Sequence, residues 1–267
     1  PDFLNSEFLI FFGANPYEAN YGPTNLAERL TQGLVDGRLK WAVVDPRFTH
    51  TASRAWKWVP VKPGGDAALI LGMIRWIIEN KRHDERFLAN ANKAAAKADN
   101  EPGWCNATWL VKIDDEGPAA HLRAADIGLG DKSTFVAIKD GQPIPFKSYD
   151  TEHPAEGDLL FDGDIGGFRV KTGLQIIREE ASSKTVEEWA EIAGVSADDI
   201  VELAQEFTSH GEKAAAESHR GLVSGTNNFH NTLAVITLNV LIVNYHWKCG
   251  SIKGGKWNEF GQEKGQP

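Results

Sequence analysis

The chain is poor in sulfur. Its 267 residues include two cysteines, Cys105 and Cys249, and one methionine. The cysteines lie far apart and form no CxxC pair, which excludes a self-contained four-cysteine iron–sulfur or zinc site. Both are therefore predicted to be buried or half-buried thiols, and a disulfide between them stays open as an alternative for an oxidising compartment.

The sequence also lacks a basic excess and a long apolar run. Its formal net charge is −9, and we expect no nucleic-acid partner because binding a phosphate backbone requires a basic face. No apolar stretch approaches the roughly 18 residues of a membrane-spanning helix, so we expect no membrane insertion. The sequence begins with Pro1 and not with methionine, and we expect it to have no signal peptide and to be the middle of a longer polypeptide.

The strongest pattern lies between Phe8 and Asp66. A first apolar run ends in GANP (residues 13–16), a helical stretch follows over roughly Thr24 to Val35, and a second apolar run ends in DPR (residues 45–47). Strand, glycine-containing turn, helix, strand and acid is the order of a nucleotide-binding βαβ unit with parallel strands.

A third loop, KPGGD at residues 62–66, precedes a strongly helical stretch, and its aspartate is predicted to cap that helix. Ligands of parallel sheets bind beyond the carboxyl ends of the strands, where glycine permits close approach and free N–H groups attract phosphate. Asp45 can accept hydrogen bonds from ribose hydroxyls or from the N1–H and N2–H₂ groups of guanine. On the βαβ order alone, a plain parallel-sheet core explains the pattern equally well, since GANP is not GxGxxG.

The middle of the chain has a different composition. Residues 100–168 are rich in glycine and proline, with short β-like runs over 107–113, 134–138 and 159–161. The acids at 114–116 and 150–164 lack the spacing of a calcium loop and are predicted to be solvated loop charges, with a metal site as the less favoured alternative.

Helical signals return after residue 170. A TxxE capping pattern begins at Thr185, a serine cap stands at Ser196, and an apolar helix is expected over residues 232–243. The small residues 214–216 are predicted to form a buried strand that delivers SHRG (residues 218–221) to the edge of a sheet.

The loops GANP, DPRFTHTA and KPGGDAAL, in this order and spacing, resemble the third domain of the molybdopterin oxidoreductases, the dimethyl sulfoxide reductase superfamily. In that family they hold the guanosine and pyrophosphate end of a pterin dinucleotide. The second half, with its RG dipeptide, its Asn/His-rich loop and LNVLIVN, is similar to the family too, so the resemblance covers nearly the whole chain. It implies an α/β fold in two parts. Residues 1–170 are expected to form a Rossmann-like parallel-sheet domain with a strand-rich insert from about residue 100, and residues 171–267 a helical and α/β return segment into a neighbouring domain.

Within the family, NATWLV, FRVKTGLQIIREEA and the SHRG…NNF pattern resemble most the catalytic subunits of tetrathionate reductases. Arsenate and thiosulfate or polysulfide reductases are the alternatives. The resemblance implies a bis(molybdopterin guanine dinucleotide) cofactor with molybdenum or tungsten, anaerobic reduction of tetrathionate to thiosulfate, and a periplasmic location. Expected partners are a small oxyanion or sulfur substrate and two further subunits, one for iron–sulfur electron transfer and one that anchors the complex to the membrane. The family's 4Fe–4S cluster and metal-coordinating residue belong to an upstream part missing from this chain, so the piece alone is expected to be inactive.

The resemblance assigns cofactor contacts to residues of these loops. The predicted cofactor-binding residues are Gly13, Asn15, Pro16, Asp45, Pro46, Arg47, Thr49, Gly64, Gly65, Asp66, His219, Gly221, Asn227 and Asn228, with Thr51 as a weaker candidate. Arg220 and His230, together with His219, Asn227 and Asn228, are expected to line the active-site funnel, where a cation would help to bind an anionic substrate. Asp45 is expected to accept hydrogen bonds from guanine or ribose. Arg47 contacts a purine or phosphate in one interpretation and forms a surface ion pair in the other. We predict no catalytic residue and no protein ligand to the metal.

Two other functions remain open. A non-catalytic Rossmann-like scaffold would keep the fold and lose the pterin, although a scaffold has no physical need of intact DPR and PGGD loops. An NAD-dependent dehydrogenase would need GxGxxG and a ribose-binding acid about 20 residues beyond the glycines, and Asp45 lies further than that from Gly13.

Overall fold

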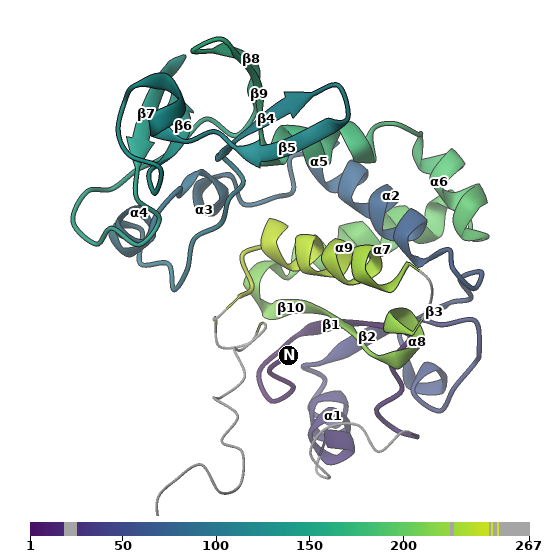
Figure 1. The fold of residues 1–267 in the computed structure, drawn as a ribbon. Coiled ribbons are helices and arrows are strands. Elements are labelled where there is room, and N and C mark those ends of the chain that lie inside the picture. The colour runs from purple at the N-terminus through teal and green to yellow at the C-terminus, as the bar shows by residue number, and fades with distance from the viewer. Residues whose placement is uncertain (19–25, 225–226, 246, 248–249, 251–267) are drawn as a thin grey trace, which may run out of the picture.

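A four-stranded parallel sheet lies at the centre of the fold (Figure 1). The computed structural model describes residues 1–18, 26–224, 227–245, 247 and 250. The strand order is β10-β1-β2-β3, and the strands are β1 Phe8–Phe12, β2 Lys40–Val44, β3 Lys57–Val59 and β10 Ala214–Ser218. All three pairings are parallel, which confirms the predicted α/β fold.

Strand β1 is buried on both faces. Phe8, Ile10 and Phe12 enter one hydrophobic cluster, whereas Leu9 and Phe11 enter a second cluster on the opposite face. Successive side chains of a strand point to opposite faces, so a strand covered on both sides reads as an unbroken apolar run. This burial explains why FLIFF indicates a central strand.

Helices cover the two faces unequally (Figure 1). Helix α1, Leu26–Val35, contributes its buried leucines to the second cluster, and the first cluster contains buried residues of the long helices. The remaining α-helices are α2 Asp66–Glu79, α3 Glu85–Ala89, α4 Lys93–Ala98, α5 Gly173–Ala181, α6 Val186–Ala193, α7 Ala197–Ser209, α8 Arg220–Val223 and α9 Asn228–Leu241. The predicted caps Thr185 and Ser196 are confirmed, because each accepts a hydrogen bond from a backbone N–H three residues later.

Short 3-10 turns complete the helical elements. They are η1 Ala52–Arg54, η2 Ala124–Ile127 and η3 Gly211–Lys213. In the part of the chain that the structure describes, no helix is both long and apolar enough to cross a bilayer.

The predicted insert is a separate antiparallel layer, at the upper left of Figure 1. Its sheet has the order β5-β4-β9-β8, and β6 and β7 form a hairpin beside it. The strands are β4 Leu110–Asp114, β5 Gly117–His121, β6 Phe135–Lys139, β7 Gln142–Phe146, β8 Asp162–Ile165 and β9 Phe168–Thr172. The predicted strand over residues 159–161 is wrong, since β8 begins only at Asp162 and includes two of the supposed loop acids.

The fourth strand of the parallel sheet comes from the second predicted part of the chain. β10 pairs with β1 along its whole length, from Phe8 opposite Ala214 to Phe12 opposite Ser218. Helices α5 to α7 lead the chain back across the sheet to the open edge of β1, as parallel pairing requires a crossover connection. The boundary at residue 170 therefore separates elements that share one sheet.

The outer edge of β10 is hydrogen-bonded by two asparagine side chains. Asn239 accepts from the N–H of Ala216 at 2.8 Å and donates to its carbonyl oxygen at 2.9 Å. Asn244 donates to the carbonyl oxygen of Ala214 at 2.8 Å. The buried backbone groups of this edge strand are thus satisfied by side chains.

Candidate functional site

The predicted loops meet at one edge of the parallel sheet. Residues 13–16 follow β1, residues 45–51 follow β2, residues 60–66 follow β3, and residues 219–221 follow β10. Parallel strands bring their carboxyl ends together, and the chain progresses in opposite directions on the two sides of β1, so ligands are expected between the loops after β1 and β10. This carboxyl edge lies at the end of the molecule that carries α8, away from the insert (Figure 1).

At this reversal point two glycines stand in backbone contact. Gly221 donates its N–H to the carbonyl oxygen of Gly13 at 3.0 Å. A Cβ on Gly13, whose φ is +55°, would lie 2.7 Å from the Cα of Gly221, and a Cβ on Gly221 would lie 2.6 Å from the Cα of Gly13. Glycine at both positions is therefore required by the contact between loops, with or without a ligand.

Asn15 joins the loops after β1 and β2. Its Oδ1 accepts a hydrogen bond from the hydroxyl of Thr51, and its Nδ2 donates to Glu18. Glu18 also accepts from the N–H of His50 at 2.7 Å. Pro16 is buried. The predicted pair Asn15-Pro16 thus holds the two loops together.

Asp45 presents a carboxylate at the end of β2. Its Oδ1 accepts a hydrogen bond from the N–H of Arg47 at 2.8 Å, and its backbone carbonyl accepts one from the indole of Trp58 at 2.9 Å. Although the residue is only 9% exposed, its Oδ2 receives no hydrogen bond from a described residue. This oxygen is available to a donor from a ligand.

Asp66 lies close enough to Asp45 for their charges to interact. Burial first, and then the charge of Asp45, raises the pKa of Asp66 above its usual value. The prediction that Asp66 caps α2 is wrong, because Gly65 occupies the N-cap position and Asp66 is the first helical residue. A carboxyl at this position is favoured by the helix dipole and remains free for other contacts.

The two glycines of the third loop have different surroundings. Gly64 adopts a φ of +85°, and a Cβ there would meet nothing within 4 Å. A Cβ on Gly65 would lie 2.9 Å from the backbone of Ala193, at the end of α6. Gly64 therefore borders open space that a ligand can enter, whereas Gly65 is required for packing.

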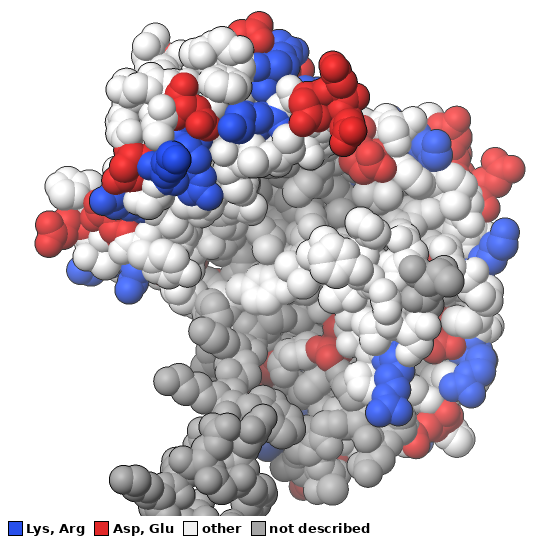
Figure 2. All heavy atoms as spheres, in the orientation of Figure 1, with Lys and Arg blue, Asp and Glu red and all other residues white. Residues whose placement is uncertain are grey.

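Three exposed cations extend from the loops. Arg47, Lys62 and Arg220 follow β2, β3 and β10, and none forms an ion pair with a residue that the structure describes. In a chain with a net charge of −9, unpaired cations at one edge attract an anion such as pyrophosphate. Figure 2 shows Lys and Arg atoms at the lower right, over the end of the molecule where α8 lies.

Two other predicted residues form hydrogen bonds with the backbone of these loops. Thr49 is buried and accepts a hydrogen bond from the N–H of Ala52, and Asn228 donates to the carbonyl oxygen of Val223 at 2.8 Å. Pro46 is exposed beside Asp45, and Asn227 stands at the N-cap of α9 without a side-chain capping bond. His219 occupies the N-cap position of α8, and exposed His230 lies in the first turn of α9.

Three residues at or near this edge, Lys62, Asn231 and Trp58, were not among the site residues predicted from the sequence. Asn231 is buried in α9, and its Oδ1 has no hydrogen-bond partner within the described ranges. Trp58 fixes Asp45 through its indole N–H. The sequence could have indicated Asn231, because an asparagine within an apolar helix is unusual. It could not have indicated the role of Trp58, because that hydrogen bond depends on how β2 and β3 pair.

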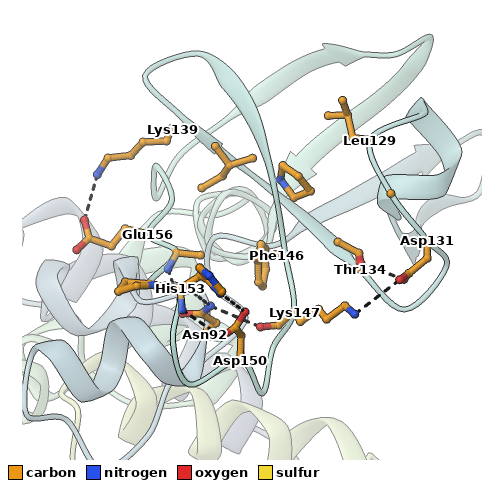
Figure 3. Close-up of a pocket in the computed structure, with 15 residues that line it drawn as sticks. Asn92, Leu129, Asp131, Thr134, Lys139, Phe146, Lys147, Asp150, His153 and Glu156 are labelled. Atoms are coloured by element: carbon orange, nitrogen blue, oxygen red, sulfur yellow. Dashed lines mark hydrogen bonds and ion pairs between the residues drawn. The ribbon is translucent and has the colours of Figure 1, made fainter.

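A pocket of about 760 Å³ in the insert holds none of the predicted residues (Figure 3). Its charged side chains are paired: Lys147 with Asp131 at 3.8 Å, Lys139 with Glu156 at 3.3 Å and His153 with Asp150 at 3.0 Å. Over the described ranges, no cluster of three or more His, Cys, Asp or Glu residues could hold a metal ion.

The thiol of Cys105 packs beside the core of the parallel-sheet unit. Burial raises its pKa to about 12. Cys249, and with it the alternative disulfide, lies outside the described residues.

Comparisons with known proteins identify the family of this chain. The family model for molybdopterin oxidoreductase matches residues 2–262. One subunit of the selenate reductase of Mesobacillus selenatarsenatis is 51% identical over 269 residues, which cover 100% of this chain and 26% of that protein. The corresponding tetrathionate reductase subunit of Salmonella typhimurium is 34% identical, over 97% of this chain and 26% of that protein. The chain thus spans about a quarter of the length of these relatives.

A solved structure shares the fold. Acetylene hydratase from Pelobacter acetylenicus superposes with a TM-score of 0.55 over 91% of this chain and 22% of that one, at 19% sequence identity. At that identity the similarity concerns the fold alone.

Proposed function

Because this chain belongs to the molybdopterin oxidoreductase family, we propose that its carboxyl-edge loops bind the nucleotide end of a molybdopterin guanine dinucleotide. The observation that carries this proposal is the Oδ2 of Asp45, which receives no hydrogen bond from a described residue. At the same edge of the sheet lie Gly64, which borders open space, and three cations that form no ion pair within the described ranges. The residues fit both parts of a nucleotide, since a carboxylate accepts from guanine or ribose and cations bind pyrophosphate.

Each side chain has a defined role in this arrangement. The Oδ2 of Asp45 accepts from the guanine N–H groups or a ribose hydroxyl, and Arg47, Lys62 and Arg220 neutralise the phosphates. Asn15 holds the loop after β1 against the loop after β2. The molybdenum–pterin group, when bound, supplies the electron- and atom-transfer chemistry, while this chain binds and orients it.

The longer polypeptide, in our proposal, is the catalytic subunit of an enzyme that reduces a small oxyanion of selenium or sulfur. Selenate is the leading candidate because the selenate reductase relative is 51% identical, against 34% for the tetrathionate reductase of Salmonella typhimurium. This order differs from the expectation of tetrathionate drawn from sequence motifs. We further propose two guanine dinucleotides per molybdenum or tungsten, a 4Fe–4S cluster upstream, iron–sulfur and membrane-anchor partners, and a periplasmic location.

Cofactor content tests the first part. The full-length polypeptide, purified from its host, is assayed for molybdenum and tungsten, and for guanosine monophosphate after acid hydrolysis. About one metal to two nucleotides is expected for the bis-pterin form. Folded protein that contains neither would contradict the proposal and leave the scaffold interpretation.

Substrate assays test the second part. The same protein, supplied with electrons from a reduced viologen dye, is given selenate, tetrathionate and arsenate in turn. We expect the highest kcat/KM with selenate. Loss of activity towards all three acceptors in protein with full cofactor content would refute the oxyanion assignment.

A further inference from the structure

Phe48 stands directly after Arg47 in the loop that follows β2, and it is 62% exposed. Exposure alone carries no conclusion, because single apolar residues are common on protein surfaces. The residues beside Phe48 in the sequence suggest a role in ligand binding. Asp45, Arg47 and Phe48 place an acceptor, a cation and an aromatic face within four consecutive residues.

Trp58 fixes both ends of this short segment. Its ring meets the ring of Phe48 edge-to-face, with centroids 5.1 Å apart and an interplanar angle of 72°. Its indole N–H donates to the backbone carbonyl of Asp45 at 2.9 Å. One indole therefore positions the aromatic ring relative to the carboxylate.

Within the described ranges, the edge-to-face contact leaves Phe48 without a stacked ring. Trp58 is its one ring contact among the residues described, and the two rings are far from parallel. Aromatic side chains prefer offset-stacked or edge-to-face neighbours, so an exposed phenyl ring can still receive a planar group. The bases of nucleotides offer such a group.

We propose that Phe48 is a stacking platform for the purine base of the bound nucleotide. This inference rests on the proposed function, which places a nucleotide at the carboxyl edge. Stacking is tolerant of base identity because every base has a π-face. The ring of Phe48 then contributes affinity, while the carboxylate of Asp45 selects guanine, which presents two N–H donors where adenine presents an acceptor.

Calorimetric titration of the full-length polypeptide, prepared without its cofactor, with GDP, ADP and inorganic pyrophosphate tests this role. The substitution Phe48→Leu keeps an apolar side chain and removes the planar face. We expect it to weaken GDP and ADP alike by about 5- to 100-fold and to leave pyrophosphate binding unchanged. Phe48→Trp keeps a planar face, so this variant should bind GDP and ADP about as tightly as the parent protein does. Tyr149→Leu, which removes a 79% exposed ring in the insert, changes none of the three constants.

The possible outcomes separate the two proposals. If Asp45→Asn reduces the preference for GDP over ADP while Phe48→Leu binds both normally, the nucleotide site stands and stacking is refuted. Equal weakening of pyrophosphate and GDP by Phe48→Leu would show a displaced loop and also refute stacking. A chain that is folded by circular dichroism and binds no GDP at millimolar concentration overturns the proposed function, and the role of Phe48 with it.

Discussion

The N–H of Gly221 donates to the carbonyl oxygen of Gly13, and neither residue leaves room for a side chain on the other. This contact closes the reversal point of the parallel sheet. It also explains the glycine of GANP in a way that GxGxxG motifs do not: the space that a Cβ would fill is taken by protein backbone.

Replacement of Gly13 by alanine should therefore lower the stability of the folded chain. Gly13→Ala combines a strained positive φ with a backbone clash, and we expect it to lower the free energy of unfolding by about 3 kcal/mol or more. Urea denaturation measures the change. Gly37→Ala is the matched control, because Gly37 has a φ of +67° and open space around it. We expect Gly37→Ala to lower the free energy of unfolding by about 1 kcal/mol. Equal losses in the two variants would show that the contact between loops contributes nothing.

Asn239 should be indispensable to the edge strand β10. Replacement by leucine leaves the N–H and carbonyl of Ala216 unpaired in a buried position, at an expected cost of about 2–4 kcal/mol. Urea denaturation measures this cost, and hydrogen exchange at the Ala216 amide should accelerate. The exposed Asn228 bonds to a single carbonyl, so Asn228→Ala is expected to cost less than about 1 kcal/mol. An unchanged exchange rate at Ala216 in Asn239→Leu would contradict this account.

Asp66 should make stability depend on pH. Burial and the charge of Asp45 raise its pKa in the folded state above the usual 3.8. A raised folded-state pKa means that its stabilising contribution is complete below the unfolded value and is lost as pH rises through the folded one. Asp66→Asn should therefore unfold at a higher temperature than the parent chain near neutral pH.

The advantage of Asp66→Asn should shrink as the pH falls below 3.8, where the carboxyl is protonated in both states. Melting temperatures of the parent chain and the variant across this range measure the effect. The exposed Asp115 supplies the control, and Asp115→Asn should show no such advantage. A lower melting temperature for Asp66→Asn at pH 7 would mean that Asp66 is stabilised by a contact of its ionised form.

Cys105 should be unreactive in the folded chain. With a pKa of about 12, roughly one thiol in ten thousand is ionised at pH 8, and the thiolate is the nucleophile. Iodoacetamide should modify the peptide that contains Cys105 slowly in the native state and rapidly in urea, as peptide mapping by mass spectrometry would record. Rapid native-state labelling at this peptide would show that the thiol is accessible.

The sequence predicted the centre of this fold because its strands are buried on both faces. The apolar runs of β1 and β2 end in glycine or aspartate, and that order is enough to locate a carboxyl edge. The small residues of β10 indicated a buried strand for the same reason. All these elements carry their signal within a few consecutive residues.

Features that depend on contacts between residues far apart in the sequence could not be predicted from local sequence patterns. β8 has the sequence DGDI, which is typical of a loop, yet it pairs with β9 and Asp162 forms ion pairs with Arg169 and Lys171. Tertiary pairing here overrides low β propensity. Asp66 matched the local pattern of a helix cap, but the turn at Gly64 shifts the cap to Gly65.

The side-chain amides along β10 have a further consequence, for the behaviour of many copies in solution. An exposed strand edge is a template on which a strand of another molecule can add, and repeated addition leads to fibrils. At Ala214 and Ala216 that template is already occupied by Asn239 and Asn244. The asparagines thus prevent strands of other molecules from adding to this edge of the parallel sheet. We expect aggregation to be the first effect of replacing them.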